Sequence, residues 1–438
     1  MLKNGWLNEF AYLILGVLIA GFLCTHSPNL EYDIDPSYLL FGPSRPPLYP
    51  IFIWLFRWAG PYQFFLIMWL QGVLLFSALL YARNWLRKNL QISDFLIFMV
   101  CLLVVLTIGF HFQIWFIQSE GLSFPLFIVT FFVLIECFEK FNLKKIFYLA
   151  VLVSLLVLTR LQFYYFYLVF VLLCGWYLWQ RTSMQKASLA VLILVGSVCA
   201  TTVVDHGYHY LKHGNFSGGS YSGLMFLVQT LFLADNNAAD YFENPTEKSY
   251  VQAMINQRNA QGLNQDASLI TSLKPSYLQY AYQSYSKNYL VLQKIIDITF
   301  NTSVENTLET ASIYKANAAA MNINKVLMLH EAKKNLIFLL WKFVQCMGNV
   351  PLFLFYLIIL LTIPFRIMTD KILYPNLSLI FVATITILTF GNAAIIALCN
   401  PDIPVYFCYS QFMFYCLAAF LINKTFIHHH ANMEFQCK

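Results

Sequence analysis

The sequence predicts an all-α fold, a polytopic bundle of about ten membrane-spanning helices with one large, mainly helical loop domain. Of the 438 residues, 59% are hydrophobic and only 11% are charged, whereas about a quarter of an ordinary soluble domain is charged. Apolar segments approaching spanning length recur along nearly the whole chain, and Lys and Arg clusters follow them, as they do at the ends of spanning helices. These observations exclude a water-soluble fold.

The predicted spans follow the apolar segments in order. The first is expected to be a retained helix rather than a cleaved signal, because no small-x-small site follows it. With the N-terminus in the cytoplasm, nearly every inner loop is basic, from Lys3 and Arg83 to Arg366 and Lys424. We therefore expect a multi-pass integral protein of the bacterial inner membrane with both termini in the cytoplasm. The spans are residues 6–24, 63–82, 94–111, 121–137, 146–160, 161–179, 187–204, 350–365, 375–398 and 404–423.

Two loops on the opposite side of the membrane divide the chain into three parts. Residues 1–204 are expected to form an N-terminal transmembrane module that includes a first outer loop at 25–62, which we call the first loop. Residues 205–349 form a periplasmic or luminal loop domain, and residues 350–438 form the C-terminal helices and a cytoplasmic tail. Sequons at Asn215 and Asn301 would be usable only in a eukaryotic organelle.

The loop domain is mixed in charge and rich in Asn, Gln, Ser and Tyr. Polar helices are expected at 246–300 and 305–335, and an amphipathic helix at 335–348 is expected to lie at the membrane interface. The net charge of +6 comes from the short inner loops. It therefore indicates orientation, and no nucleic acid partner is expected.

Polar groups that are costly near a membrane gather in the first loop. Asp33 and Asp35 follow the first span and precede a proline-rich stretch, RPPLYP at Arg45–Pro50. Carboxylates at the hydrocarbon boundary are costly unless they are solvated, paired or used in chemistry. Two interpretations stay open: a solvated acidic loop, or a carboxylate general base in a pocket shaped by the prolines.

Two more ionisable residues lie at helix ends on the same side. Glu120 begins the fourth span, where a helix N-terminus favours a carboxylate for its dipole alone. Arg160 ends the fifth span and needs an anionic partner at that depth. A phosphate would match its guanidinium bidentately, and a salt bridge to Glu120 or Asp35 would serve equally. Tyr406 and Tyr409, at the mouth of the last span, are explained by an aromatic belt.

Metal ligands are only weakly indicated. His206, His209 and His213 are three and four residues apart, so they would share one face of a helix. Gly207 and Gly214 argue against a rigid helix there, and an interfacial polar cluster is the default interpretation. The ten cysteines include no CxxC pair and no Cys/His ligand spacing, so packed thiols are favoured. We name no metal ligand, and a divalent metal ion stays open as a cofactor.

Four local motifs occur in a characteristic order and on one side of the membrane. They are DPSYLL at Asp35–Leu40, RPPLYP at Arg45–Pro50, SEGL at Ser119–Leu122 and LTR at Leu158–Arg160. With the helix count and the large loop, they make the chain resemble the GT-C superfamily, the integral membrane glycosyltransferases that use polyprenyl-phosphate-linked sugars. Protein mannosyltransferases and aminoarabinose transferases are of this kind. The resemblance covers the N-terminal transmembrane module well and the rest of the chain only in topology.

The resemblance implies an inverting glycosyltransferase of envelope glycans, lipids or proteins. Asp35, with Asp33 as the alternate, would be the base that orients or deprotonates the acceptor hydroxyl. Arg160 and Arg45 would hold the phosphate leaving group, which needs charge stabilisation more than acid catalysis. The implied partners are a polyprenyl-phosphate-linked sugar donor, membrane lipids, and a glycan, lipid or protein acceptor. The remaining implied substrate-binding residues are Tyr38, Tyr49 and Glu120.

The chain also departs from the family pattern. Many members have an Arg before the Tyr at the end of a late helix, whereas Val405 and Cys408 precede the two tyrosines here. A phosphate contact from this end is therefore in doubt. Residues 205–349 contain no WWD-like motif, so transfer of a whole glycan to asparagine is not supported.

Two rival functions stay open. A polymerase or ligase of lipid-linked glycans would depend on arginines in the loop domain, which offers only Arg258. A transporter or flippase would place polar groups and broken helices at the bilayer midplane. Here the clearly ionisable groups collect at the outer surface, with Glu136 near an inner helix end as a partial exception, so surface chemistry is favoured.

Overall fold

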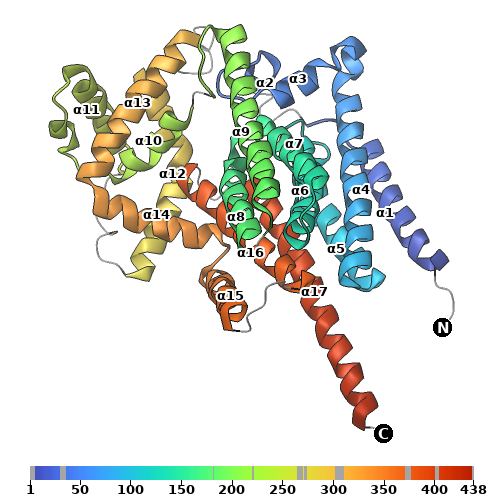
Figure 1. Cartoon of the computed structure of the whole chain (residues 1–438). Helices are drawn as coiled ribbons and strands as arrows, with labels where there is room; N and C mark the ends of the chain where they lie inside the picture. Colours follow the sequence, from blue (N-terminus) through green and yellow to red (C-terminus); the bar gives the residue numbers. More distant parts are fainter. Residues whose placement is uncertain are drawn as a thin grey trace.

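The computed structural model of the chain is all-helical (Figure 1). Within the ranges that the structure describes, no strand occurs, and Asn29 and Phe116 form one isolated β-bridge. The predicted all-α class is therefore confirmed. The described residues are 5–29, 36–180, 182–219, 221–263, 270, 274–300, 310–369, 376–399 and 404–436.

Long helices form a bundle in the right half of Figure 1. The short helices α2 (Pro36–Leu39) and α3 (Leu48–Trp54) lie at its upper end, which we call the site end, and the C-terminus lies at the opposite end. The bundle helices are α1 (Gly5–Thr25), α4 (Gln63–Leu90), α5 (Asp94–Val104), α6 (Glu120–Glu139), α7 (Leu143–Thr159), α8 (Tyr165–Trp179), α9 (Met184–His213), α15 (Val350–Thr369), α16 (Leu377–Cys399) and α17 (Pro404–Gln436).

A second group of helices, which we call the side module, lies beside the bundle on the left of Figure 1. Its buried apolar residues form a hydrophobic core of their own, which includes Leu227, Phe232, Tyr285 and Phe338. Helices α10 and α14 of the module contact α16 of the bundle. The module helices are α10 (Ser222–Leu233), α11 (Pro245–Ala260), α12 (Pro275–Phe300), α13 (Thr310–His330) and α14 (Ala332–Cys346).

Seven helices of the described residues are long and apolar enough to cross a membrane, or up to eight if α14 and α15, bent by 89° at their junction, form one span. The chain is therefore a membrane protein, but the expected number of about ten spans is not confirmed. Helix α7 has 17 residues. A helix of that length covers roughly 25 Å of a hydrocarbon core about 30 Å thick.

Two local predictions are wrong. A rigid helix was not expected around Gly207, but helix α9 continues to His213 and includes the expected domain boundary after residue 204. One glycine inside a helix costs only about 1 kcal/mol, so Gly207 does not end α9; Gly214, with φ of 73°, does. The expected polar helix at 246–300 is two helices, α11 and α12, and the apolar helix α10 was not expected. The helix expected at 335–348 is present as α14.

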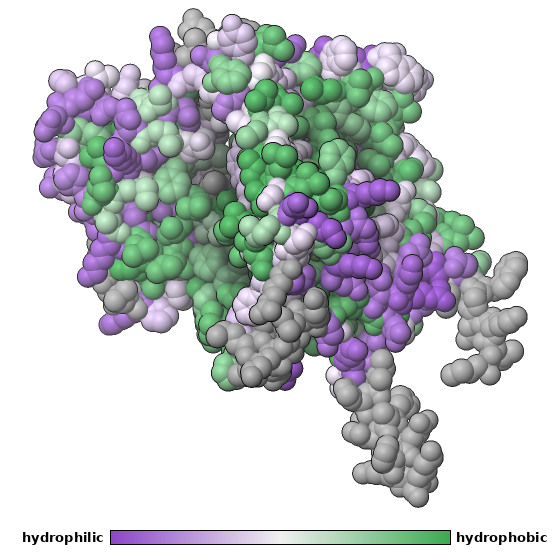
Figure 2. All heavy atoms as spheres, viewed as in Figure 1, coloured by the Kyte–Doolittle hydropathy of each residue, from purple (hydrophilic) through white to green (hydrophobic). Residues whose placement is uncertain are grey.

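Figure 2 shows an apolar surface over the middle of the bundle, with hydrophilic residues gathered below it. At the end opposite the site end, Arg83 forms ion pairs with Glu9 and Asp94, and Lys145 pairs with Glu136. These are the basic helix ends that the sequence places in the cytoplasm.

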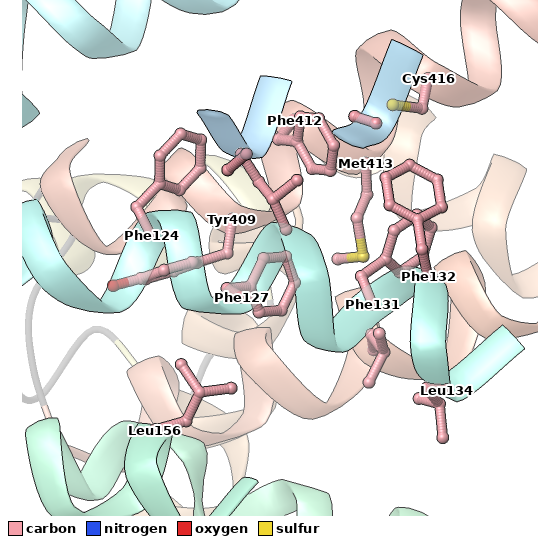
Figure 3. Packing of buried hydrophobic residues seen from close by; sticks show 14 of the residues in the cluster. Phe124, Phe127, Phe131, Phe132, Leu134, Leu156, Tyr409, Phe412, Met413 and Cys416 are labelled. Carbon is pink, nitrogen blue, oxygen red and sulfur yellow. The ribbon is translucent and has the colours of Figure 1, made fainter. Parts of the chain in front are cut away.

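Helix α6 lies at the centre of the bundle, in contact with α4, α7, α16 and α17. Its residues Phe124, Phe127 and Phe131 are fully buried and pack against Tyr409 and Phe412 of α17 (Figure 3). Helices in lipid are held together largely by van der Waals contact, because lipid tails are as apolar as the side chains. This packing fixes the first turns of α6 and α17 relative to each other at the site end.

Arg258 of α11 is buried inside the side module. Its guanidinium donates to the carbonyls of Leu231 and Ala234, at 2.8 and 2.6 Å, and to the side chain of Asn236 at 2.9 Å. The last carbonyls of a helix have no partner within the helix, so Arg258 caps the end of α10. Burial lowers the pKa of Arg258 to about 10, and the group stays charged at neutral pH.

Arg258→Met is expected to destabilise the side module by about 2 kcal/mol, because hydrogen bonds from a charged donor to the capped carbonyls are lost. Thermal unfolding of the full chain in detergent measures the change. Lys248→Met is the control: Lys248 pairs with Asp240 at 2.9 Å, but both side chains are largely exposed, so little change is expected. Equal shifts in the two variants would contradict the capping role.

Candidate functional site

Segments that are distant in the sequence meet at the site end of the bundle. Tyr38 lies in α2, Glu120 begins α6, Arg160 follows α7 and Tyr406 lies in the first turns of α17. Three of these four positions belong to motifs that the sequence singles out. The two candidate bases, Asp33 and Asp35, lie outside the described residues.

Three of these side chains form a connected network with Ser119, which we call the Arg160 cluster: Tyr38, Ser119, Glu120 and Arg160. The guanidinium of Arg160 pairs with the carboxylate of Glu120 and donates to the hydroxyl of Ser119 at 3.2 Å. Tyr38 donates to Ser119 at 3.1 Å, and Ser119 donates to Glu120 at 3.2 Å. A serine hydroxyl has one donor and two acceptor positions, so Ser119 is saturated.

The Arg160 cluster is deeply buried. The side chains of Glu120 and Arg160 are only 4% and 12% exposed. Removing charges from water is costly, and an ion pair offsets that cost only with good geometry and further hydrogen bonds, which Ser119 supplies. Of the alternatives that the sequence left open for Arg160, the salt bridge to Glu120 is present; phosphate binding stays a prediction.

Arg45 and Tyr49 of the first loop approach the cluster through Tyr38. The guanidinium carbon of Arg45, a half-buried residue, lies 4.4 Å from the centroid of the Tyr38 ring. Tyr49 is fully buried and meets the same ring edge-on at 5.1 Å. Burial raises the pKa of the Tyr49 phenol well above its ordinary value, so this phenol stays neutral. Tyr49 therefore positions Tyr38, while Arg45 adds a second cation beside it.

Helix α17 contributes two tyrosines whose role the sequence analysis missed. Arg160 lies over the ring of Tyr406, with 4.7 Å between its guanidinium carbon and the ring centroid. Tyr409 is fully buried, and its hydroxyl lies 2.7 Å from that of Ser123 on α6. The expected aromatic belt is therefore wrong for Tyr409. The hydroxyl of Ser123 inside an apolar helix was the sequence signal for a polar contact at this position.

The turn that carries Ser119 and Glu120 is held by a glutamine from α4. The side-chain amide of Gln71 donates to the carbonyls of Phe116 and Gln118, each at 3.4 Å. Gln71 is buried, and Gly121 of α6 lies directly against its amide. The absence of a side chain at Gly121 is what lets Gln71 reach these carbonyls.

Comparisons of the chain with protein-family models, with curated proteins and with solved structures give no match. The functional interpretation therefore depends on the residues of this chain and on their contacts.

The structure also places the histidines that the sequence analysis considered as metal ligands. His206, His209 and His213 all lie on α9, and the ring centroids of His209 and His213 are 5.7 Å apart. Among the described residues, no group of three or more His, Cys, Asp or Glu side chains has a geometry that could hold a metal ion.

Proposed function

We propose that the chain is a membrane glycosyltransferase, which transfers a sugar from a polyprenyl-phosphate-linked donor to a glycan, lipid or protein of the cell envelope. The proposal is carried by the convergence of motifs that are far apart in the sequence. Tyr38 of DPSYLL, Glu120 of SEGL and Arg160 of LTR meet at the hydroxyl of Ser119. Arg45 of RPPLYP stacks on the Tyr38 ring, so all four motifs meet around one tyrosine.

The chemistry of the transfer fits this distribution of charge. The acceptor oxygen attacks C1 of the sugar as the bond from C1 to the phosphate oxygen breaks, which inverts the configuration at C1. The departing lipid phosphate gains negative charge, and cations placed in advance stabilise it. Arg45 on the ring of Tyr38 and Arg160 near its hydroxyl are the two cations. The acceptor proton goes to Asp35, three residues before Tyr38 in the sequence, with Asp33 as the alternate base.

We propose that the protein lies in a bacterial inner membrane with both termini in the cytoplasm, and the charge distribution supports this orientation. The end opposite the site end carries Arg83, Arg87 and Lys145, as expected of cytoplasmic helix ends. The site end then faces the periplasm, where a polyprenyl-phosphate sugar would have its head group at the membrane surface and its chain in the bilayer.

Of the rival functions, a polymerase or ligase of lipid-linked glycans is weakened by Arg258. This arginine, the only one in the loop domain, binds backbone carbonyls inside the side module and is not placed to bind a substrate.

Asp35→Asn is expected to reduce sugar transfer at least a hundredfold while donor binding is retained, because the general base is lost and the phosphate contacts are not. The assay uses purified protein in nanodiscs, a panel of polyprenyl-phosphate sugars, and extracted envelope lipids as acceptors. Asp240→Asn, which changes an exposed carboxylate of the side module, is the matched control and should transfer normally. Arg45→Gln should weaken donor binding.

Three outcomes oppose the proposal in different ways. Full transfer by Asp35→Asn would exclude Asp35 as the base. Donor binding without transfer in any variant would favour a transporter or flippase. If no polyprenyl phosphate binds at all, the lipid-phosphate hypothesis fails.

A further inference from the structure

A second polar cluster lies on the other side of the first loop. Asp205 and His209, on the last turns of α9, are almost completely buried, with 3% and 0% of their surfaces exposed. The ring of Tyr208 lies 6.4 Å from that of Phe41 in the first loop. Gly219 packs against Ser44 of the first loop and against Leu161, the neighbour of Arg160. We call Asp205, Tyr208, His209, Ser217 and Tyr314 the Asp205 cluster.

The Asp205 cluster has more hydrogen-bonding capacity than the described residues satisfy. Both carboxylate oxygens of Asp205 and the hydroxyls of Tyr208 and Ser217 are buried without a hydrogen-bond partner in the described part of the chain. Each such group costs about 1–3 kcal/mol, and a charged one costs more. Native proteins leave few of them, so four within one short stretch indicate a place for a polar ligand.

His209 lies between Asp205 and Tyr314. Its Nδ1 lies 3.3 Å from the hydroxyl of Tyr314, and its Nε2 lies 3.6 Å from a carboxylate oxygen of Asp205. Because the two ring nitrogens are directed at Tyr314 and Asp205, the imidazole is held in one orientation. What the cluster still requires is a set of hydrogen-bond donors for Asp205.

The main chain of Gly218 lies against Asp205. A Cβ atom at Gly218 would lie 3.0 Å from Asp205 Oδ2 and 3.3 Å from Nε2 of His206. The ring of Phe41 packs near that of Tyr208, and the ring of Phe216 packs near that of His206. A carboxylate acceptor, hydroxyl groups and flanking aromatic faces together match a carbohydrate, whose hydroxyls donate and whose C–H faces pack on rings.

We propose that the Asp205 cluster is a carbohydrate-binding site, in which sugar hydroxyls donate to Asp205 and Tyr208. Its contacts with the first loop and with Leu161, the neighbour of Arg160, assign it to the acceptor sugar. That assignment rests on the proposed function, whereas carbohydrate binding by itself does not.

The test is saturation-transfer NMR on the full chain in nanodiscs with glucose, galactose, mannose and N-acetylglucosamine as probes. At least one of them should bind, and Asp205→Asn should weaken that binding about tenfold or more, because a charged acceptor is lost. Gly218→Ala should weaken it without changing charge, since its methyl group would lie against the carboxylate. Asp240→Asn should bind sugar normally. If Asp205→Asn folds poorly, Tyr208→Phe, which removes one unpartnered hydroxyl, takes its place.

The proposal is overturned if sugars bind Asp205→Asn and Gly218→Ala as well as the wild type. It is also overturned if a divalent metal ion binds at Asp205 and a chelator abolishes the sugar signal. If the wild type binds polyprenyl phosphate but none of the sugars, the carbohydrate site fails and the proposed function stands. If sugars bind through Asp205 but no polyprenyl phosphate binds, the site stands and the proposed function fails.

Discussion

Arg160→Leu is expected to destabilise the protein by about 3–5 kcal/mol, because the buried carboxylate of Glu120 would lose its only counter-charge in the Arg160 cluster. Leucine fills much of the space of the arginine stem but cannot neutralise Glu120 or donate to Ser119. The double variant Glu120→Gln with Arg160→Leu should recover much of the loss, since a neutral amide is far cheaper to bury than an unpaired charge. Unfolding of the full chain in detergent or nanodiscs measures all three proteins.

The control for this experiment is Arg87→Leu at the opposite end of the bundle. Arg87 also forms an ion pair, with Asp94 at 3.0 Å, but its side chain is 55% exposed. An exposed pair contributes only about 0–1 kcal/mol. If Arg87→Leu and Arg160→Leu shift stability equally, or if the double variant is no more stable than Arg160→Leu, the buried pair does not have the role assigned to it.

Gly121→Ala is expected to destabilise the protein by about 3 kcal/mol, although alanine favours helices more than glycine does. The new methyl group would overlap the buried amide of Gln71, so Gln71 would have to leave the carbonyls of Phe116 and Gln118. The turn that carries Ser119 and Glu120 would then shift. Stability and donor binding should therefore fall together, as measured by unfolding and by binding of a polyprenyl phosphate.

Helix α8 offers a matched control for Gly121→Ala. Gly175 is also a glycine within a bundle helix, but no atom lies within 4 Å of the place where its Cβ would be. Gly175→Ala should be neutral or stabilising by up to about 1 kcal/mol. In the double variant Gln71→Ala with Gly121→Ala, the overlap disappears and part of the stability should return. A destabilisation of similar size in Gly175→Ala would show that the overlap at Gly121 is not the cause.

The sequence predicts those features that follow from the free-energy cost of placing each segment in the membrane. The membrane class and most helix positions follow from apolar length and from the charges at helix ends. The need of Arg160 for a buried anion also follows, because an arginine at that depth is costly alone. The sequence does not show which anion pairs with Arg160, since Glu120, Asp35 and a phosphate would each neutralise it. The packing of α6 against α7 brings Glu120 to Arg160.

The parts that were missed depend on contacts between distant segments. Ser123 and Tyr409 are 286 positions apart, and no periodicity in either helix shows that the two hydroxyls meet. Gly207 was given too much weight as a helix breaker, because the remaining hydrogen bonds of α9 outweigh one unfavourable residue. The expected number of about ten spans is not confirmed, because apolar length alone does not separate a spanning helix from a short buried one.

The contribution of α17 to the Arg160 cluster has a consequence for biosynthesis. Arg160 and Glu120 are made in the first half of the chain, but Tyr406, which lies under the guanidinium, and Tyr409, which holds Ser123, belong to the last helix. A chain that has emerged from the ribosome only as far as α16 has its charged residues in the membrane without these partners. The contact of Tyr406 with Arg160 and that of Tyr409 with Ser123 therefore form only after α17 has been made.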